Sequence, residues 1–98
     1  MPNSASIKRF LVEEFLPDVP ESEIGEDFDL IENGVVDSLG LLKVIAWLEG
    51  HFRVSVDIAE MVPENFRSVT AIGAVLRRAQ AQAALQVGQP AQLARADA

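Results

Sequence analysis

Most of the fold follows from one short stretch near the middle of the chain, Gly34-Val35-Val36-Asp37-Ser38-Leu39-Gly40-Leu41-Leu42. Gly34 suits a turn with positive φ, because glycine lacks the Cβ that disfavours this conformation in other residues. Asp37 stands where a helix N-cap belongs, so Ser38 opens the helix that follows. Leu41 begins a stripe of apolar residues at helical spacing, which predicts an amphipathic helix over residues 38–52.

An earlier segment shows the same periodicity. Apolar side chains recur at helical spacing over residues 4–15, which predicts a helix with one stripe facing a core. Asn3, Ser4 or Ser6 could cap its beginning, and Pro17 ends it. The apolar residues of this stripe and of the stripe in 38–52 are Ile7, Phe10, Leu11 and Phe15, followed by Leu41, Val44, Ile45, Leu48 and Phe52.

The last predicted helix begins after Ser68, a candidate N-cap. Because alanine favours helix, the alanine-rich sequence extends this helix to about Val87. Between the second and last helices, residues 57–66 are predicted to hold one or two short helical turns around Pro63. The apolar stripe of the last helix consists of Val69, Ile72, Val75, Leu76 and Ala79.

These elements predict an all-α fold. We expect a small four-helix bundle with three main helices, a short third helix and a long loop between helices 1 and 2. The length of 98 residues fits one domain, which we assign to residues 4–78. Residues 79–98 contain eight Ala and five Gln, which predicts a helix extension followed by a disordered C-terminal tail.

The loop between the first two helices, residues 16–36, is strongly acidic. Ten of the fifteen acidic residues lie between Glu13 and Asp37, and no Lys or Arg occurs from Leu11 to Leu42. This segment is interpreted either as a solvated acidic loop or as a negative surface that steers basic enzymes. Apolar residues within it are expected to pin it onto the helices, namely Ile24, Phe28, Leu30 and Ile31.

Metal and thiol chemistry is not predicted. Asp27 and Asp29 have the first spacing of a calcium loop, but Ile31 stands where the third ligand belongs and Glu32 where the required glycine belongs. The absence of Cys excludes a disulfide scaffold, a thiolate zinc site and a cysteine nucleophile.

Charge and hydropathy narrow the choice of partners. Eight Lys and Arg residues against fifteen acids give a net charge of −7, which argues against binding to the nucleic-acid backbone. No apolar run approaches the ~18 residues of a membrane span, and residues 1–10 lack the apolar core of a secretory signal. The sequence therefore predicts a small cytoplasmic protein, a monomer by default, that binds neither nucleic acid nor a membrane and has basic protein partners.

The tripeptide Asp37-Ser38-Leu39 closes the acidic loop and opens an amphipathic helix. In this context the sequence resembles the acyl carrier protein family, the phosphopantetheine-binding carrier domains, over about residues 7–76. The resemblance rests on the first helix, the loop with Asp27-Phe28-Asp29-Leu30, the Asp37-Ser38-Leu39 motif, the second helix ending at Phe52, the short third helix and Val69-Thr70-Ala71-Ile72 in the last helix. It implies that Ser38 carries 4′-phosphopantetheine through a phosphodiester.

Physical chemistry agrees with a modified serine at this position. A phosphodiester is an anion, and a helix N-terminus offers it unpaired N–H groups and the positive end of the helix dipole, worth ~0.3–1 kcal/mol. A transferase could grip the Asp37 carboxylate with basic groups and contact the apolar Leu39. The alternative is that Ser38 only caps a helix, which is the commoner role of a lone serine.

A catalytic role is not predicted. His51 is the only His, and thirteen residues separate it from Ser38. Along a continuous helix this separation is about 20 Å, so the two side chains cannot form a catalytic hydrogen bond. Trp47 is interpreted as packing at the edge of the core, with the lining of an acyl chamber as the alternative.

The exposed face of the second helix bears on the kind of carrier. Carriers of fatty acid synthesis are similar but rich in acids on this face, whereas here it holds one Lys and one Glu. With the longer segment at residues 63–66, this favours a discrete carrier of polyketide or nonribosomal peptide biosynthesis that holds acyl or aminoacyl groups. The alternatives are a carrier of type II fatty acid synthesis and an unmodified acidic helical interaction domain. The predicted partner-binding residues are Leu39, Leu42, Lys43, Ala46 and Glu49.

The resemblance also implies a succession of partners. A phosphopantetheinyl transferase uses coenzyme A to load Ser38, and a ligase or adenylating enzyme then charges the thiol with an acyl or aminoacyl group. An acyltransferase or ketosynthase is the further partner. The protein itself is predicted to be a substrate of these enzymes and not an enzyme.

Overall fold

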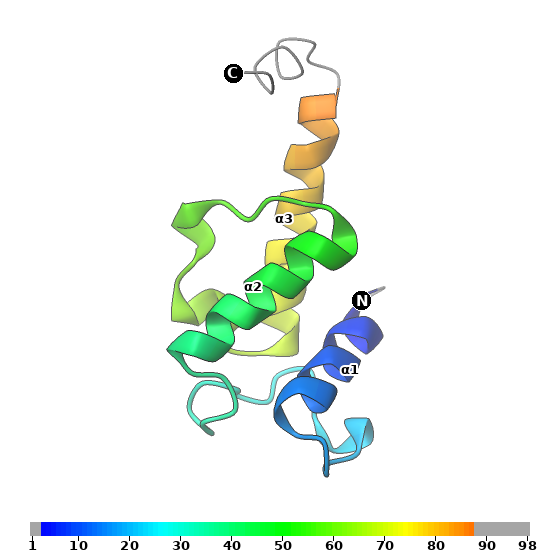
Figure 1. Cartoon of the computed structure of the whole chain (residues 1–98), viewed down its shortest axis with the longest axis vertical. Coiled ribbons are helices and arrows are strands. Elements are labelled where there is room, and N and C mark those ends of the chain that lie inside the picture. The colour runs from blue at the N-terminus through cyan, green and yellow to red at the C-terminus, as the bar shows by residue number, and fades with distance from the viewer. Residues whose placement is uncertain (1–2, 88–98) are drawn as a thin grey trace.

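The computed structural model describes residues 3–87, and every regular element in this range is helical (Figure 1). The elements are α1 (Ser4–Phe15), the 3-10 turn η1 (Glu21–Glu23), α2 (Ser38–Phe52), η2 (Ile58–Glu60), η3 (Pro63–Phe66) and α3 (Val69–Val87). The all-α prediction is confirmed. The two 3-10 turns η2 and η3 agree with the one or two short helical turns expected around Pro63, and they stay separate because Pro63 has no N–H to continue a helix from η2. The predicted tail beyond Val87 lies outside the described residues.

The three α-helices share one core. In Figure 1, α2 crosses in front of α3, and α1 lies below and to the right of α2. The last turns of α3 extend past the other helices. The Phe10 ring of α1 stacks on the Trp47 ring of α2, with 4.6 Å between the ring centroids. Residues of α1 also pack against α3. No helix of the described segment is long and apolar enough to cross a membrane.

The core contains the predicted stripes and several residues from the loops. The predicted stripe of α3 is buried in full, whereas the outer members of the α1 and α2 stripes are only partly buried. The segments between the α-helices contribute apolar residues that lack helical periodicity and were not predicted as core. These residues are Val36, Val54, Val56 and Phe66.

The long loop is fastened to the N-terminal end of α3. The N–H of Leu30 donates to the carbonyl of Arg67 at 2.6 Å, and the N–H of Thr70 donates to the carbonyl of Glu26 at 2.9 Å. Leu30 is fully buried and Ile24 nearly so, as expected of loop anchors. Phe28 was predicted as an anchor but is exposed, because it lies in a turn at the surface.

Candidate functional site

The start of α2 is fixed by hydrogen bonds on both sides of Ser38. The carboxylate Oδ1 of Asp37 accepts the N–H of Gly40 at 2.7 Å, which confirms the predicted N-cap. On the loop side, the N–H groups of Val35 and Val36 both donate to the carbonyl of Leu30, at 2.9 and 3.0 Å. Ser38 is therefore placed as the first residue of α2, between the hydrogen-bonded loop end and the cap of the helix.

A turn at Gly34 brings the loop to this point. Gly34 has φ +74°, the left-handed conformation that the sequence predicted. Its N–H donates to the carbonyl of Ile31 at 3.1 Å, and Val36 beyond it is almost completely buried. Burial of Val36 turns the next residues, Asp37 and Ser38, toward solvent, where both are exposed.

The surroundings of Ser38 fit a phosphodiester-linked group. Its side chain is exposed, and the N–H groups of the first helical turn create a partial positive charge that favours an anion. Beside it lies a hollow of about 210 Å³, which we call the Ser38 hollow. This hollow is lined by Phe15, Val35, Asp37, Leu39, Gly40 and Lys43.

Four of the five predicted partner-binding residues lie exposed on α2. Leu39 is 65% exposed and Leu42 58% exposed, so both leave most of their apolar surface in water. Lys43 and Ala46 are exposed as well. The Lys43 amine lies 3.4 Å from Glu14 Oε2, an ion pair at the surface.

Glu49, the fifth of these residues, has a structural contact. Its carboxylate accepts the N–H of Val56 at 2.9 Å and is partly buried. This bond ties the last turn of α2 to the extended segment that follows. The sequence pattern had placed Glu49 with the exposed residues because helical spacing says nothing about a loop that folds back onto the helix.

Two further exposed apolar residues were missed by sequence reasoning. Ile58 in η2 is 82% exposed and Val62, just before η3, is 40% exposed. The segment was predicted only as short turns, so no stripe could separate inward from outward residues. The one signal in the sequence was that the apolar residues between Ile58 and Val62 follow no helical stripe, which is compatible with some of them being exposed.

Ser38 and His51 are at opposite ends of α2. The helix is continuous from Ser38 to Phe52, so thirteen residues place them about 20 Å apart along the axis. The His51 ring stacks on Trp47, with 5.0 Å between centroids. A Ser–His pair is therefore excluded by geometry.

Among the acids of the long loop, Asp29 stabilises the loop itself, whereas most of the others are exposed. Asp29 Oδ1 accepts the N–H groups of Ile31 and Glu32, at 3.1 and 2.8 Å, and its other oxygen pairs with Arg67. Within residues 3–87, no group of three or more acids or His is arranged to hold a metal ion.

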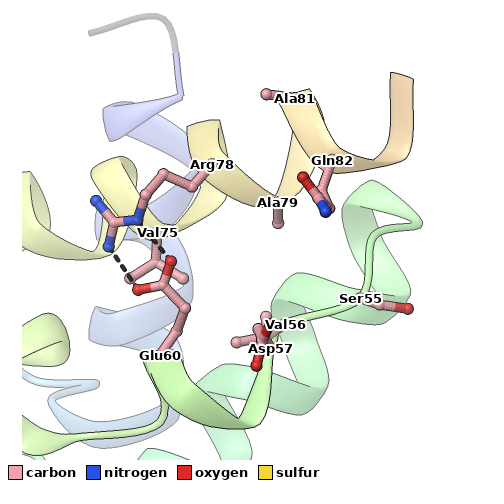
Figure 2. Close-up of a pocket in the computed structure, with 9 residues that line it drawn as sticks. All are labelled: Ser55, Val56, Asp57, Glu60, Val75, Arg78, Ala79, Ala81 and Gln82. Atoms are coloured by element: carbon pink, nitrogen blue, oxygen red, sulfur yellow. Dashed lines mark hydrogen bonds and ion pairs between the residues drawn. The ribbon is translucent and has the colours of Figure 1, made fainter. Parts of the chain in front are cut away.

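A larger hollow, of about 390 Å³, lies away from Ser38 between the segment after α2 and the second half of α3 (Figure 2). Arg78 reaches from α3 to Glu60, donating from Nε at 2.6 Å and from Nη2 at 2.8 Å. This hydrogen-bonded guanidinium lowers the pKa of Glu60. The hollow contains no residue adjacent to Ser38, so it does not form part of the Ser38 site.

Comparison with known proteins indicates the same family as the sequence resemblance. A family described as "Phosphopantetheine attachment site" matches residues 9–76, which include all of α2. The chain is also similar to D-alanyl carrier proteins of Streptococcus pyogenes, from serotype M5 (strain Manfredo), serotype M49 (strain NZ131) and serotype M1. Each is 40% identical over 58 residues, which cover 59% of this chain and 70% of the relative.

Proposed function

Because the chain belongs to the family of phosphopantetheine-attachment domains, we propose that Ser38 bears the prosthetic group and that the loaded protein carries an aminoacyl or other short acyl group between enzymes. The family consists of carriers with a 4′-phosphopantetheine group, which are substrates of a transferase and of loading enzymes rather than catalysts. The observation that supports Ser38 is its position as the exposed first residue of a helix that the Asp37 side chain caps.

The attachment step needs only an accessible hydroxyl from this chain. Ser38 Oγ forms a bond to the phosphorus of coenzyme A that bears the pantetheine, the pyrophosphate bond breaks, and 3′,5′-ADP leaves. The hydroxyl proton passes to the transferase. Asp37 offers a carboxylate to basic groups of that enzyme, and Leu39 offers an apolar contact on the other side of the serine.

When bound, the prosthetic group supplies the thiol that this cysteine-free chain lacks, and that thiol holds the cargo as a thioester. No protein thiol competes for the acyl group. The sequence similarity to D-alanyl carrier proteins supports an amino acid as the cargo and an ATP-dependent adenylating ligase as the loading enzyme. The low number of acids on the exposed face of α2 supports a place in polyketide or nonribosomal peptide assembly.

The exposed side chains next to Ser38 are suited to brief docking. Leu39 and Leu42 provide apolar contact, and Lys43 and Ala46 lie beside them on α2. The acidic loop adds long-range attraction to basic partners, which raises association rates and weakens with salt. We place this exchange in the cytoplasm, where coenzyme A and ATP are available to the loading enzymes.

The cargo class can be tested on purified protein loaded with phosphopantetheine. We expect a D-alanine-adenylating ligase with ATP and D-alanine to add one aminoacyl group, removable by hydroxylamine, while a malonyl acyltransferase adds none. Ser38→Ala is the control that accepts neither group. Malonyl loading without aminoacyl loading would contradict the proposed cargo and indicate a carrier of the fatty acid or polyketide type.

A further inference from the structure

The Ser38 hollow lies between the start of α2 and the end of α1, next to the proposed attachment point. Asp37 and Leu39, the two chain neighbours of Ser38, belong to its walls. Phe15, the last residue of α1, forms part of the opposite wall. A flexible group fixed to Ser38 therefore has this hollow within immediate reach.

Three of the six residues that line the hollow are apolar, namely Phe15, Val35 and Leu39, and Gly40 leaves room for the Phe15 ring beside α2. A Cβ on Gly40 would lie 3.0 Å from Cε1 of the Phe15 ring and 3.3 Å from Asp37 Oδ1. The missing side chain allows the ring to approach the helix. Phe15 and Val35 are partly buried, and Leu39 leaves most of its surface in water. An apolar ligand group would cover surface that is otherwise hydrated.

Lys43 adds a positively charged group to the lining of the hollow. The Lys43 amine is paired with Glu14 at 3.4 Å, and about half of each side chain is exposed. Such exposed pairs contribute little to stability. The lysine can therefore exchange this contact for another anion at little cost.

We propose that the Ser38 hollow is a resting site for the prosthetic arm, occupied by its branched pantoyl segment when no enzyme is docked. This inference rests on the proposed attachment at Ser38. The arm offers what the walls can bind: an anionic phosphodiester for Lys43 and a dimethyl group for Phe15, Val35 and Leu39. Tethering gives the arm an effective concentration in the mM range, so weak contacts are sufficient to seat it.

The resting site also links docking to release of the arm. Leu39 belongs both to the wall of the hollow and to the proposed docking surface. A partner that packs on Leu39 competes with the seated arm for the same side chain. The site does not obstruct delivery, because an arm that is seated half of the time lowers the apparent affinity of a partner only about twofold.

The test uses nuclear Overhauser contacts in the loaded protein without any partner enzyme. Protein loaded with ¹³C-labelled pantetheine should show contacts from the dimethyl protons to the Phe15 ring and the Val35 methyls. Leu39→Asn should lower their intensity by about threefold or more, as the seated population becomes a minority. The matched control is Leu42→Asn, since Leu42 is a similarly exposed leucine of α2 outside the hollow, and it should leave the contacts in place.

Intact mass separates failure of this inference from failure of the proposed function. Spectra are recorded only after mass shows complete loading, so a slow transferase does not alter the result. Protein that never loads would overturn the attachment at Ser38. Loaded protein without these contacts, or with equal losses in both leucine variants, would overturn the resting site alone. If Leu39→Asn resists loading, Val35→Thr serves as the second variant and should also weaken the contacts with Phe15.

Discussion

Asp37 has two roles at the start of α2 that substitution can separate. Its carboxylate caps the helix through the N–H of Gly40, and its charge faces solvent beside Ser38. Asp37→Asn keeps a capping oxygen, whereas Asp37→Ala removes it and should lower the free energy of unfolding by about 1 kcal/mol. Both variants should load more slowly with phosphopantetheine than the wild type. Urea unfolding and a loading time course measure the two effects, and wild-type loading of Asp37→Asn would contradict the role of the charge.

Gly40 and Gly50 form a matched pair within the same helix. A Cβ on Gly40 would press on the Phe15 ring, whereas a Cβ on Gly50 meets nothing within 4 Å. Gly50→Ala should stabilise the protein by about 0.5–1 kcal/mol through helix propensity. Gly40→Ala should be less stable than Gly50→Ala by about 1–3 kcal/mol, the usual cost of overpacking. Denaturant unfolding followed by Trp47 fluorescence measures this difference, and equal stability would show that Phe15 moves aside freely.

For single residues, turn and cap positions could be predicted from the sequence, whereas contacts between helices could not. The positive φ of Gly34 and the cap at Asp37 follow from the residue types and their immediate neighbours. The need for glycine at position 40 depends on Phe15, which is distant in sequence and approaches only when α1 packs.

At the scale of the elements, Glu49 is expected to matter more for the fold than for docking. Its bond to the Val56 N–H holds the segment that follows α2. Glu49→Ala should cost about 1–2 kcal/mol because it leaves a partly buried N–H without this acceptor. Lys43→Ala, which removes only an exposed ion pair, should cost less than about 1 kcal/mol. Equal thermal stability of the two variants would show that water replaces the carboxylate without loss.

The Glu60–Arg78 pair joins η2 to α3 and should make stability depend on pH. Arg78 lowers the pKa of Glu60 below its ordinary value of 4.5. The contribution is therefore complete above pH 4.5 and is lost as the pH falls through the lowered pKa. Melting temperatures should show a larger gap between wild type and Glu60→Gln at neutral pH than at about pH 3. Glu64→Gln, an exposed substitution on η3, is the control, and a gap that does not change with pH would contradict this role.

At the scale of the whole molecule, one core joins all three α-helices. Leu48 of α2 is fully buried within it, so Leu48→Ala should cost about 2–5 kcal/mol. Loss of that amount can unfold a domain whose total stability is about 5–15 kcal/mol. Thermal unfolding followed by circular dichroism measures the effect. A negligible change in melting temperature would show that Leu48 is outside the core.

The fold class was predictable because helical periodicity repeats along most of the chain. The stripe of α3 is buried as predicted, and Ser68 caps this helix through the N–H of Ala71 at 3.1 Å. The loops were less predictable, since exposed Phe28 and buried Val36 do not differ in local pattern. The local pattern predicts only a capped helix start at Ser38, and the candidate role of this serine came from the resemblance of Asp37-Ser38-Leu39 and its surroundings to a carrier family. The Ser38 hollow could not be predicted, because it requires the packing of two helices.

Intact mass decides directly whether Ser38 is the attachment point. Folded wild-type protein is incubated with coenzyme A and a promiscuous phosphopantetheinyl transferase, beside Ser38→Ala and the exposed control Ser55→Ala. The account predicts a gain of one phosphopantetheine in wild type and Ser55→Ala and none in Ser38→Ala, with the modified peptide containing Ser38. No gain on folded wild-type protein, or a gain that persists in Ser38→Ala, would contradict it.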